Sequence, residues 1–204
     1  AYDYLVHGEY DFGDGTFIEG VRSLMPGHIL TLDLQSSRVQ LEEWWSPCAE
    51  LSVHIPFEEA ALQLRQLMLS NVRMHLRSDV PLGAALSGGL DSSAIVCAIR
   101  HLEPDADIHT FSFIAKGTAL SEEYWVDRVN KHVGARAHKV SVTQEELAAD
   151  LDDLIATQGE PFGSTSIYAQ YRVFKLAREQ GMTVTLDGQG ADELLGGYNA
   201  YPGH

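Results

Sequence analysis

The sequence predicts an α/β protein in which a parallel sheet carries helices on both faces, preceded by a small antiparallel β segment. From residue 81 onward, short apolar runs alternate with segments of helical periodicity, an order typical of a parallel sheet with crossover helices. Before residue 46, apolar and polar positions alternate between turn-forming dipeptides, which indicates antiparallel strands. With 204 residues, 45% of them hydrophobic, the chain is long enough to bury one good core.

The antiparallel segment is expected within residues 15–45, with turns at Pro26-Gly27 and at Ser36-Ser37. A domain boundary is expected between residues 47 and 56, where this pattern breaks. Residues 56–76 then place apolar side chains at helical spacing, which predicts a long helix. These side chains are Leu62, Leu67, Leu69, Val72 and Leu76.

Strands and helical segments alternate in the rest of the chain. The expected strands cover residues 81–87, 108–115, 135–142 and 182–187, and the expected helices cover residues 92–102, 122–133, 144–158 and 166–181. In a parallel sheet built this way, the carboxyl ends of the strands meet at one edge. Open parallel sheets bind their ligands at that edge.

The charge pattern argues against a nucleic-acid binder. The formal net charge is −15, and only 14 Lys and Arg residues are scattered along the chain, whereas phosphate backbones need clustered cations. If the ligand is itself an anion, metal ions must help to bind it. No apolar run approaches the roughly 18 residues of a membrane span, and no segment marks export. A cytoplasmic protein without membrane or nucleic-acid partners is therefore expected.

The stretch "LSGGLDSSA" over residues 86–94 follows a short apolar run and precedes a helical segment. Gly88 and Gly89 therefore fall at the carboxyl end of a strand, where glycine lets the backbone turn tightly and approach an anion. A carboxylate at Asp91 would repel phosphate unless it holds Mg²⁺ that bridges to the ligand. The alternative is a glycine turn with Asp91 or Ser92 as a helix N-cap. The absence of a lysine and the spacing exclude a Walker loop.

A second stretch, "LDGQGADELLGGY" over residues 186–198, also follows an expected strand. Gly188 and Gly190 again permit close backbone approach, and three carboxylates lie within seven residues, at Asp187, Asp192 and Glu193. If the two strands are neighbours, Asp91 and Asp192 could share metal ions on one triphosphate. The alternative is a glycine-rich loop whose acidic residues favour the start of a helix.

The two motifs carry a resemblance to a known family. "SGGLDSS" resembles the pyrophosphate-binding loop of ATP pyrophosphatases, and its combination with "DGQGADELLGGY" resembles the glutamine-dependent asparagine synthetases. The resemblance implies a sheet of the ATP-pyrophosphatase type, which is adenine nucleotide alpha hydrolase-like and Rossmann-like. Residues 1–47 resemble the C-terminal strands of a glutamine amidotransferase domain, residues 48–55 a linker, and residues 56–204 the N-terminal portion of the synthetase domain.

The resemblance also implies a site and a reaction. Aspartate would attack Mg-ATP to give β-aspartyl-AMP with release of pyrophosphate, and glutamine-derived ammonia would displace AMP to give asparagine. By match of position, the pyrophosphate and Mg²⁺ loop would consist of Ser87, Gly88, Gly89, Asp91, Ser92 and Ser93. Adenosine would be surrounded by Leu86, Phe113, Asp187 and Gly188. Asp192 would be the second metal ligand, and Gln189 stands at the position of the family's base.

Two departures from the family's pattern leave the acceptor open. Gln189 cannot take a proton at neutral pH. Arg172 is the arginine nearest to the family's acceptor-binding position but does not match it, so a solvated helix face or a surface ion pair is expected for Arg172. His109 and His138, at strand edges, are expected to be structural. The alternatives are a β-lactam synthetase-like or lasso-peptide cyclase-like enzyme that adenylates another carboxylate, and a non-catalytic ATP-binding relative.

Neither cysteine of the chain can serve as the nucleophile of a glutaminase. Cys48 and Cys97 stand far apart without CxxC spacing, which disfavours a disulfide framework or a zinc site and fits a reducing compartment. The family's catalytic cysteine lies at the mature N-terminus, and the chain is expected to be an internal fragment that lacks it. The fragment is therefore expected to be inactive by itself. Family members are often dimers, so a homodimer is an expectation that rests on the resemblance alone.

Overall fold

The computed structural model describes residues 2–8, 13–47 and 54–198. The chain forms two compact units, Ala1–Ile55 with Ile155–Gly163, and Pro56–Leu154 with Ser164–His204. The expected linker lies mostly outside the described residues. Among the described helices, none is both long and apolar enough to cross a membrane.

The first unit contains the expected antiparallel segment. After the short helix α1 (Tyr2–His7), strands β1 (His28–Leu32) and β2 (Val39–Glu43) pair in antiparallel register, with Leu30 opposite Leu41. The turn between them falls at the expected position, where Ser37 adopts a φ of 55°. The side chain of Asp33 accepts hydrogen bonds from the backbone N–H groups that follow it, which stabilises this turn.

The expectation of strands from residue 15 onward is wrong for the part before His28. There the backbone forms only an isolated bridge between Gly15 and Arg22. The Thr16 hydroxyl lies 3.1 Å from the backbone nitrogen of Ile18 and 2.9 Å from the carbonyl oxygen of Val21. Such local side-chain hydrogen bonds compete with strand pairing.

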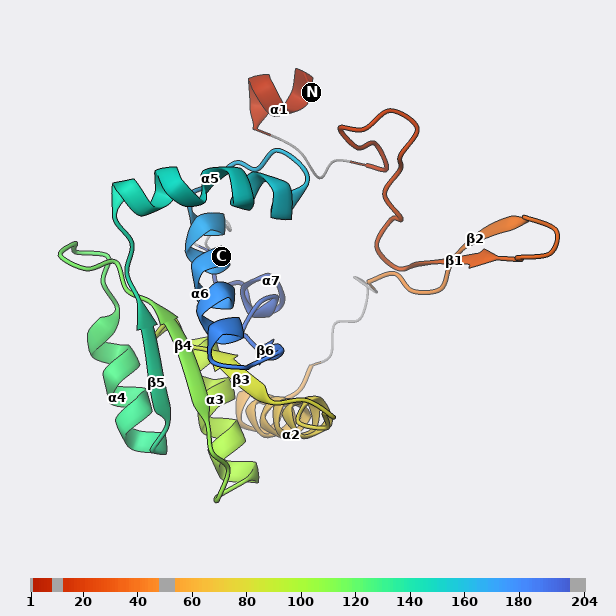
Figure 1. Ribbon diagram of the computed structural model, residues 1–204. Helices are drawn as coiled ribbons and strands as arrows, with labels where there is room; N and C mark the ends of the chain where they lie inside the picture. Colours follow the sequence, from red (N-terminus) through yellow and green to blue (C-terminus); the bar gives the residue numbers. More distant parts are fainter. Residues whose placement is uncertain (1, 9–12, 48–53, 199–204) are drawn as a thin grey trace. The chain divides into compact units, whose positions relative to one another are not determined.

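The second unit contains a parallel sheet of four strands in the order β5-β4-β3-β6 (Figure 1). These strands are β3 (Leu82–Ala85), β4 (His109–Phe113), β5 (Arg136–Val140) and β6 (Val184–Leu186). All three pairings are parallel. The α/β class with a preceding antiparallel segment is therefore confirmed.

The helices of the chain lie close to their expected positions. They are α2 (Phe57–His75), α3 (Leu90–Leu102), α4 (Glu123–Val133), α5 (Gln144–Gln158) and α6 (Ser166–Glu179). The short α7 (Ala191–Leu195) follows the second glycine-rich stretch, where a helix start was expected only in the alternative interpretation. The one boundary that matters for the site is the start of α3, which begins at Leu90, two residues before the expected start.

Both faces of the sheet are covered by helices, as the sequence predicted. Ile108 and Ile114, which flank β4, belong to a core cluster with residues of α3 and α4. Phe111, on the opposite face of the same strand, packs with Val173 and Ala177 of α6. The alternation of side chains along a strand explains this division, because neighbouring residues point to opposite faces.

The strand order creates a crevice for a ligand. The chain passes from β3 outward through β4 to β5, and then returns to place β6 on the other side of β3, with Leu82 opposite Val184 and Ala84 opposite Leu186. The connection from β3 to β4 therefore runs to one side of β3, whereas β6 lies on its other side, so the strand order reverses at β3. Such a switch point is where open α/β sheets bind ligands at the carboxyl ends of their strands.

Candidate functional site

The loop after β3 is held together by its own serines. The Ser87 backbone N–H donates to the Ser92 hydroxyl at 3.2 Å, and the Gly89 N–H donates to the Ser87 hydroxyl at 3.2 Å. The Ser93 hydroxyl donates to the Gly89 carbonyl at 2.6 Å. These bonds fix the backbone of the loop before any ligand arrives.

The loop also sets the start of α3. Gly89 is the N-cap residue, and no side chain caps the helix, so the alternative with Asp91 or Ser92 as N-cap is wrong. Asp91 and Ser92 instead lie in the first turn. The N–H groups of a first turn have no partner within their helix, and the helix dipole makes them attractive to an anion.

Gly88 must be glycine for two reasons. Its φ of +95° lies in the region that L side chains rarely adopt. A Cβ atom at this position would also lie 3.1 Å from the Glu122 carbonyl oxygen and 3.2 Å from the Trp125 Cβ. The loop after β3 is therefore packed tightly against the start of α4.

The loop after β6 lies directly on the first turn of α3. A Cβ atom built on Gly188 would be 3.0 Å from the Asp91 Cβ and 3.2 Å from the Ser92 backbone nitrogen. The Gln189 N–H donates to the Asp187 carboxylate at 3.0 Å, which shapes this loop. The conjecture that the two glycine-rich loops are neighbours is confirmed.

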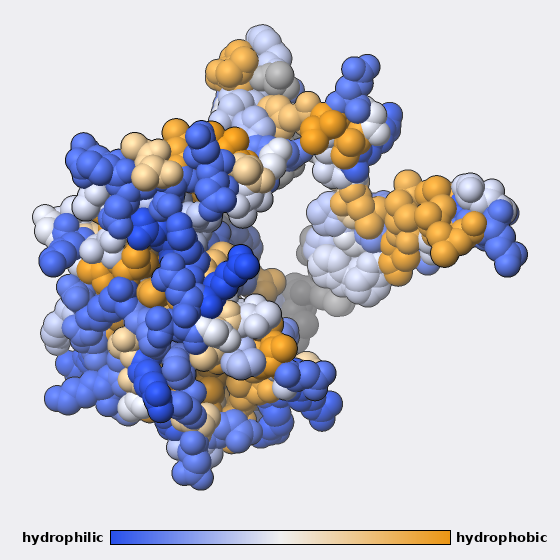
Figure 2. Space-filling model, in the orientation of Figure 1, coloured by the Kyte–Doolittle hydropathy of each residue, from blue (hydrophilic) through white to orange (hydrophobic). Residues whose placement is uncertain are grey.

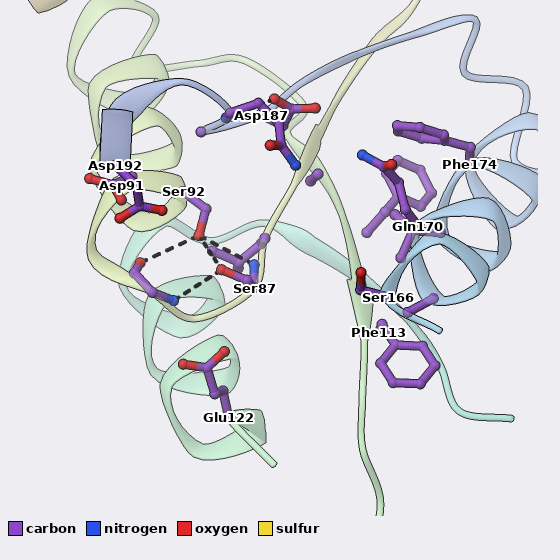
Figure 3. Close-up of a pocket in the computed structure, with 18 of the residues that line it drawn as sticks. Ser87, Asp91, Ser92, Phe113, Glu122, Ser166, Gln170, Phe174, Asp187 and Asp192 are labelled. Atoms are coloured by element: carbon purple, nitrogen blue, oxygen red, sulfur yellow. Dashed lines mark hydrogen bonds between the residues drawn. The ribbon is translucent and has the colours of Figure 1, made fainter. Parts of the chain in front are cut away.

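Together the loops line a cavity of about 520 Å³ (Figure 3), a size typical of small-molecule sites. The predicted site residues that line it are Leu86, Ser87, Gly89, Asp91, Ser92, Phe113, Asp187, Gly188, Gln189 and Asp192. Gly88 and Ser93 do not line it; they border a groove between α3 and α4. Glu193 does not line it either. Its carboxylate accepts a hydrogen bond from the Tyr198 hydroxyl, which lowers the pKa of Glu193.

Several lining residues were missed from the sequence. Glu122 contributes from the start of α4, and Ser166, Gln170 and Phe174 contribute from α6. The three residues of α6 recur at intervals of four, so they share one helix face. That spacing was visible in the sequence, but which face of α6 meets the cavity was not.

Every charged side chain that lines the described cavity is a carboxylate: Asp91, Glu122, Asp187 and Asp192. Within the described residues, no group of three or more His, Cys, Asp or Glu could hold a metal ion. Two carboxylates are nevertheless what Mg²⁺ takes from a protein when phosphates supply further ligands. Asp91 and Asp192, from the first turns of α3 and α7, fit that donor set.

The basic residues singled out earlier do not reach the cavity. Arg172 forms ion pairs with Asp150 at 2.9 Å and with Glu146 at 3.1 Å. The expected ion pair is confirmed, but its surface position is not, because the Arg172 side chain is only 16% exposed. Although burial disfavours its cation, hydrogen bonds with Tyr168 and Glu146 raise the pKa of Arg172. His109 and His138 stack on each other with ring nitrogens 3.1 Å apart, away from the described cavity lining.

The fold and the site define an α/β protein with a cavity at the switch point of a parallel sheet, lined by two glycine-rich loops and four carboxylates. The sequence model of the asparagine synthase family matches residues 63–204. The chain belongs to the asparagine synthase family.

Three relatives illustrate this similarity. Glutamine-hydrolysing asparagine synthetase 1 of Bacillus subtilis is 34% identical over 139 residues, 68% of this chain and 22% of the relative. Glutamine-hydrolysing asparagine synthetase 2 of Arabidopsis thaliana is 32% identical over 194 residues, which cover 88% of this chain and 32% of the relative. Amidase chry2 of Gibberella zeae is 26% identical over 207 residues, which cover 91% of this chain and 30% of the relative. The chain therefore spans a third or less of the length of these relatives.

Among solved structures, the chain is similar to an ammonia-dependent NAD synthetase from Campylobacter jejuni. The TM-score is 0.44 and the sequence identity 14%, over 71% of this chain and 62% of that one. A similarity this distant supports no inference about the ligand or the reaction.

Proposed function

We propose that the whole protein is an ATP-dependent ligase that forms an amide from aspartate and glutamine-derived ammonia. Aspartate is activated as β-aspartyl-AMP, pyrophosphate leaves, and ammonia then displaces AMP to give asparagine. The observation that carries this proposal is the contact between the two glycine-rich loops at the ends of β3 and β6. Family membership supports ATP use and amide formation as the class of reaction.

The residues of this chain have two tasks in that reaction. The uncapped first turn of α3 offers backbone N–H groups and the positive end of the helix dipole to the leaving pyrophosphate. Asp91 and Asp192 would hold Mg²⁺, which would neutralise phosphate charge. This neutralisation is essential because the described cavity wall contributes only negative charges, which would repel a triphosphate in the absence of cations.

Gln189 lies in the cavity without the ability to accept a proton at neutral pH. We infer that ammonia attacks as the neutral molecule that the glutaminase delivers, with Gln189 as a hydrogen-bonding group. Leu86, Phe113, Asp187 and Gly188 surround the adenosine.

A second candidate is a carboxylate-adenylating enzyme with another acceptor, such as one that closes a β-lactam or a lasso-peptide ring. The observation that favours it is the described cavity lining, which holds no Lys, Arg or His to pair with the carboxylate of aspartate.

The remaining proposals concern the whole protein. Residues 1–47 would form the last strands of a glutamine amidotransferase domain, which is supported by the β1–β2 hairpin. Its apolar side chains are exposed, as Figure 2 shows for one face, and an isolated two-stranded hairpin is only marginally stable. Residues 56–204 would form the first part of the synthetase domain. We also propose a cytoplasmic homodimer that uses only small-molecule substrates.

The proposed function is tested on the full-length protein with Mg-ATP, aspartate and either ammonium or glutamine. Equal yields of AMP, pyrophosphate and asparagine are expected. Asp91→Asn should abolish the reaction, whereas Asp105→Asn, at an exposed position outside the cavity lining, should not. Mg-ATP binding that needs Asp91, without AMP formation from aspartate, would overturn the asparagine assignment and favour the second candidate.

A further inference from the structure

One face of α6 builds the end of the cavity that lies away from the loop after β3. Ser166, Gln170 and Phe174 all line the cavity, and none of them carries a charge. Figure 3 shows them across the cavity from Ser87 and Asp91, with the Gln170 carboxamide directed into the space between. This wall had no role in the site predicted from sequence.

The two ends of the cavity differ in chemistry. At one end lie the first turn of α3 and the carboxylates of Asp91 and Asp192. On the side of α6 lie the side chains of Phe113 and Phe174 (Figure 3). A nucleotide has the same polarity, because a polyanionic tail is joined to a flat aromatic base. A nucleotide whose phosphates lie on α3 therefore directs its base towards α6.

Gln170 is the polar group at the apolar end that is free to bind a base. Within the described part of the chain, its carboxamide makes no hydrogen bond, whereas the Ser166 hydroxyl is already within 2.9 Å of the Ser164 hydroxyl. A carboxamide presents a donor and an acceptor side by side. Adenine presents the matching pair, an exocyclic amine beside a ring nitrogen that accepts.

We propose that Gln170 selects the base of the nucleotide. Its carboxamide accepts a hydrogen bond from the adenine amine and donates one to the adjacent ring nitrogen, while Phe113 and Phe174 contact the ring. This inference rests on the proposed ATP site, and it divides the cavity into a phosphate end on α3 and a base end on α6. Gln170 is thus a specificity residue that takes no part in the chemistry.

Calorimetric titration of the full-length protein with three ligands, in the presence of Mg²⁺, tests the phosphate end and the base end of the cavity separately. ATP has both parts, purine riboside triphosphate lacks only the exocyclic amine, and inorganic tripolyphosphate lacks the base. Gln170→Leu should weaken ATP binding about tenfold, the cost of one or two hydrogen bonds, and leave tripolyphosphate binding unchanged. The wild type should prefer ATP to purine riboside triphosphate by about fivefold, and the variant should lose this preference.

Gln66→Leu is the matched control, because Gln66 is exposed on α2 and lies outside the cavity lining. It should bind all three ligands like the wild type. Wild-type affinity for ATP in Gln170→Leu would overturn the inference, and so would an equal loss for ATP and tripolyphosphate. If the wild type binds tripolyphosphate in a manner that needs Asp91, the phosphate end stands whatever Gln170 does. If the wild type binds neither ATP nor tripolyphosphate, both the proposed nucleotide site and the proposed role of Gln170 are wrong.

Discussion

Asp91 and Asp192 reach one cavity from the first turns of two different helices, α3 and α7. Carboxylates near a helix N-terminus are stabilised by the helix dipole, so each residue is tolerated without a ligand. For Asp192 the sequence left open whether this local role was the whole explanation. In the structure, both side chains also line the cavity, in addition to their local role at a helix start.

Gly88 gives a test of the loop at the level of a single residue. Gly88→Ala should destabilise the protein by about 1–2 kcal/mol for the left-handed backbone, and by about 1 kcal/mol or more for the contact with α4. Urea denaturation of the variant measures the sum. Gly117→Ala is the control, because Gly117 has a φ of +77° but no neighbour within 4 Å. An equal loss in the two variants would contradict the tight packing of the loop against Glu122.

At the scale of elements, α5 and α6 are joined by a network of charges. Asp150 accepts hydrogen bonds from Lys175, Arg172 and Tyr168, at distances of 2.9 Å each. The hydrogen bond from Lys175 is the main cause that lowers the pKa of Asp150. The network fixes α6 through residues other than those that line the cavity.

A carboxyl group with a lowered pKa in the folded state stabilises the protein above its unfolded pKa of about 3.9. This stabilisation is lost as the pH falls below that value and through the lower folded pKa. Asp150→Asn should therefore cost about 1–3 kcal/mol at pH 7 and flatten the loss of stability between about pH 4 and pH 2. Asp152→Asn, at an exposed position of α5, should change neither. Parallel acid unfolding curves for wild type and Asp150→Asn would contradict this role.

The contact between β3 and β4 depends on a missing side chain. A Cβ atom on Gly83 would lie 2.6 Å from the ring of Phe111, which is fully buried. Gly83→Ala should therefore cost about 1–3 kcal/mol by overpacking. In a double-mutant cycle measured by thermal unfolding, Phe111→Leu should recover part of that loss. Strictly additive effects of the two substitutions would show that the ring does not set the requirement for glycine.

At the scale of the whole molecule, a net charge of −15 coincides with a cavity whose described charged residues are all carboxylates. Self-repulsion destabilises such a protein, and specific binding of a cation to the folded state stabilises it. Mg²⁺ at ten times its dissociation constant should add about 1.4 kcal/mol, which raises Tm by about 3–6 °C. NaCl of equal ionic strength should raise Tm less. Asp91→Asn should remove the difference between the two salts, and a difference that persists would place the Mg²⁺ elsewhere.

Local features of the fold were accessible from the sequence because they depend on neighbouring residues. The period of apolar side chains predicted every strand of the parallel sheet and every long helix to within a few residues. The start of α3 was misjudged because Gly89 serves as N-cap, a role that periodicity does not report. The strands expected before His28 were misjudged because the Thr16 hydroxyl forms hydrogen bonds with the backbone of Ile18 and Val21 there.

The sequence by itself determined that two glycine-rich loops with carboxylates follow strands of an α/β protein, because turn chemistry and helix starts are local. Only the tertiary structure decided that β6 lies next to β3, that Gly188 touches the first turn of α3, and that Gln170 rather than Arg172 faces the cavity. Strand order and the rotation of a helix about its axis depend on packing between residues far apart in the chain. The same helical period fits several rotations of α6, and the charge network around Asp150 helps to select one.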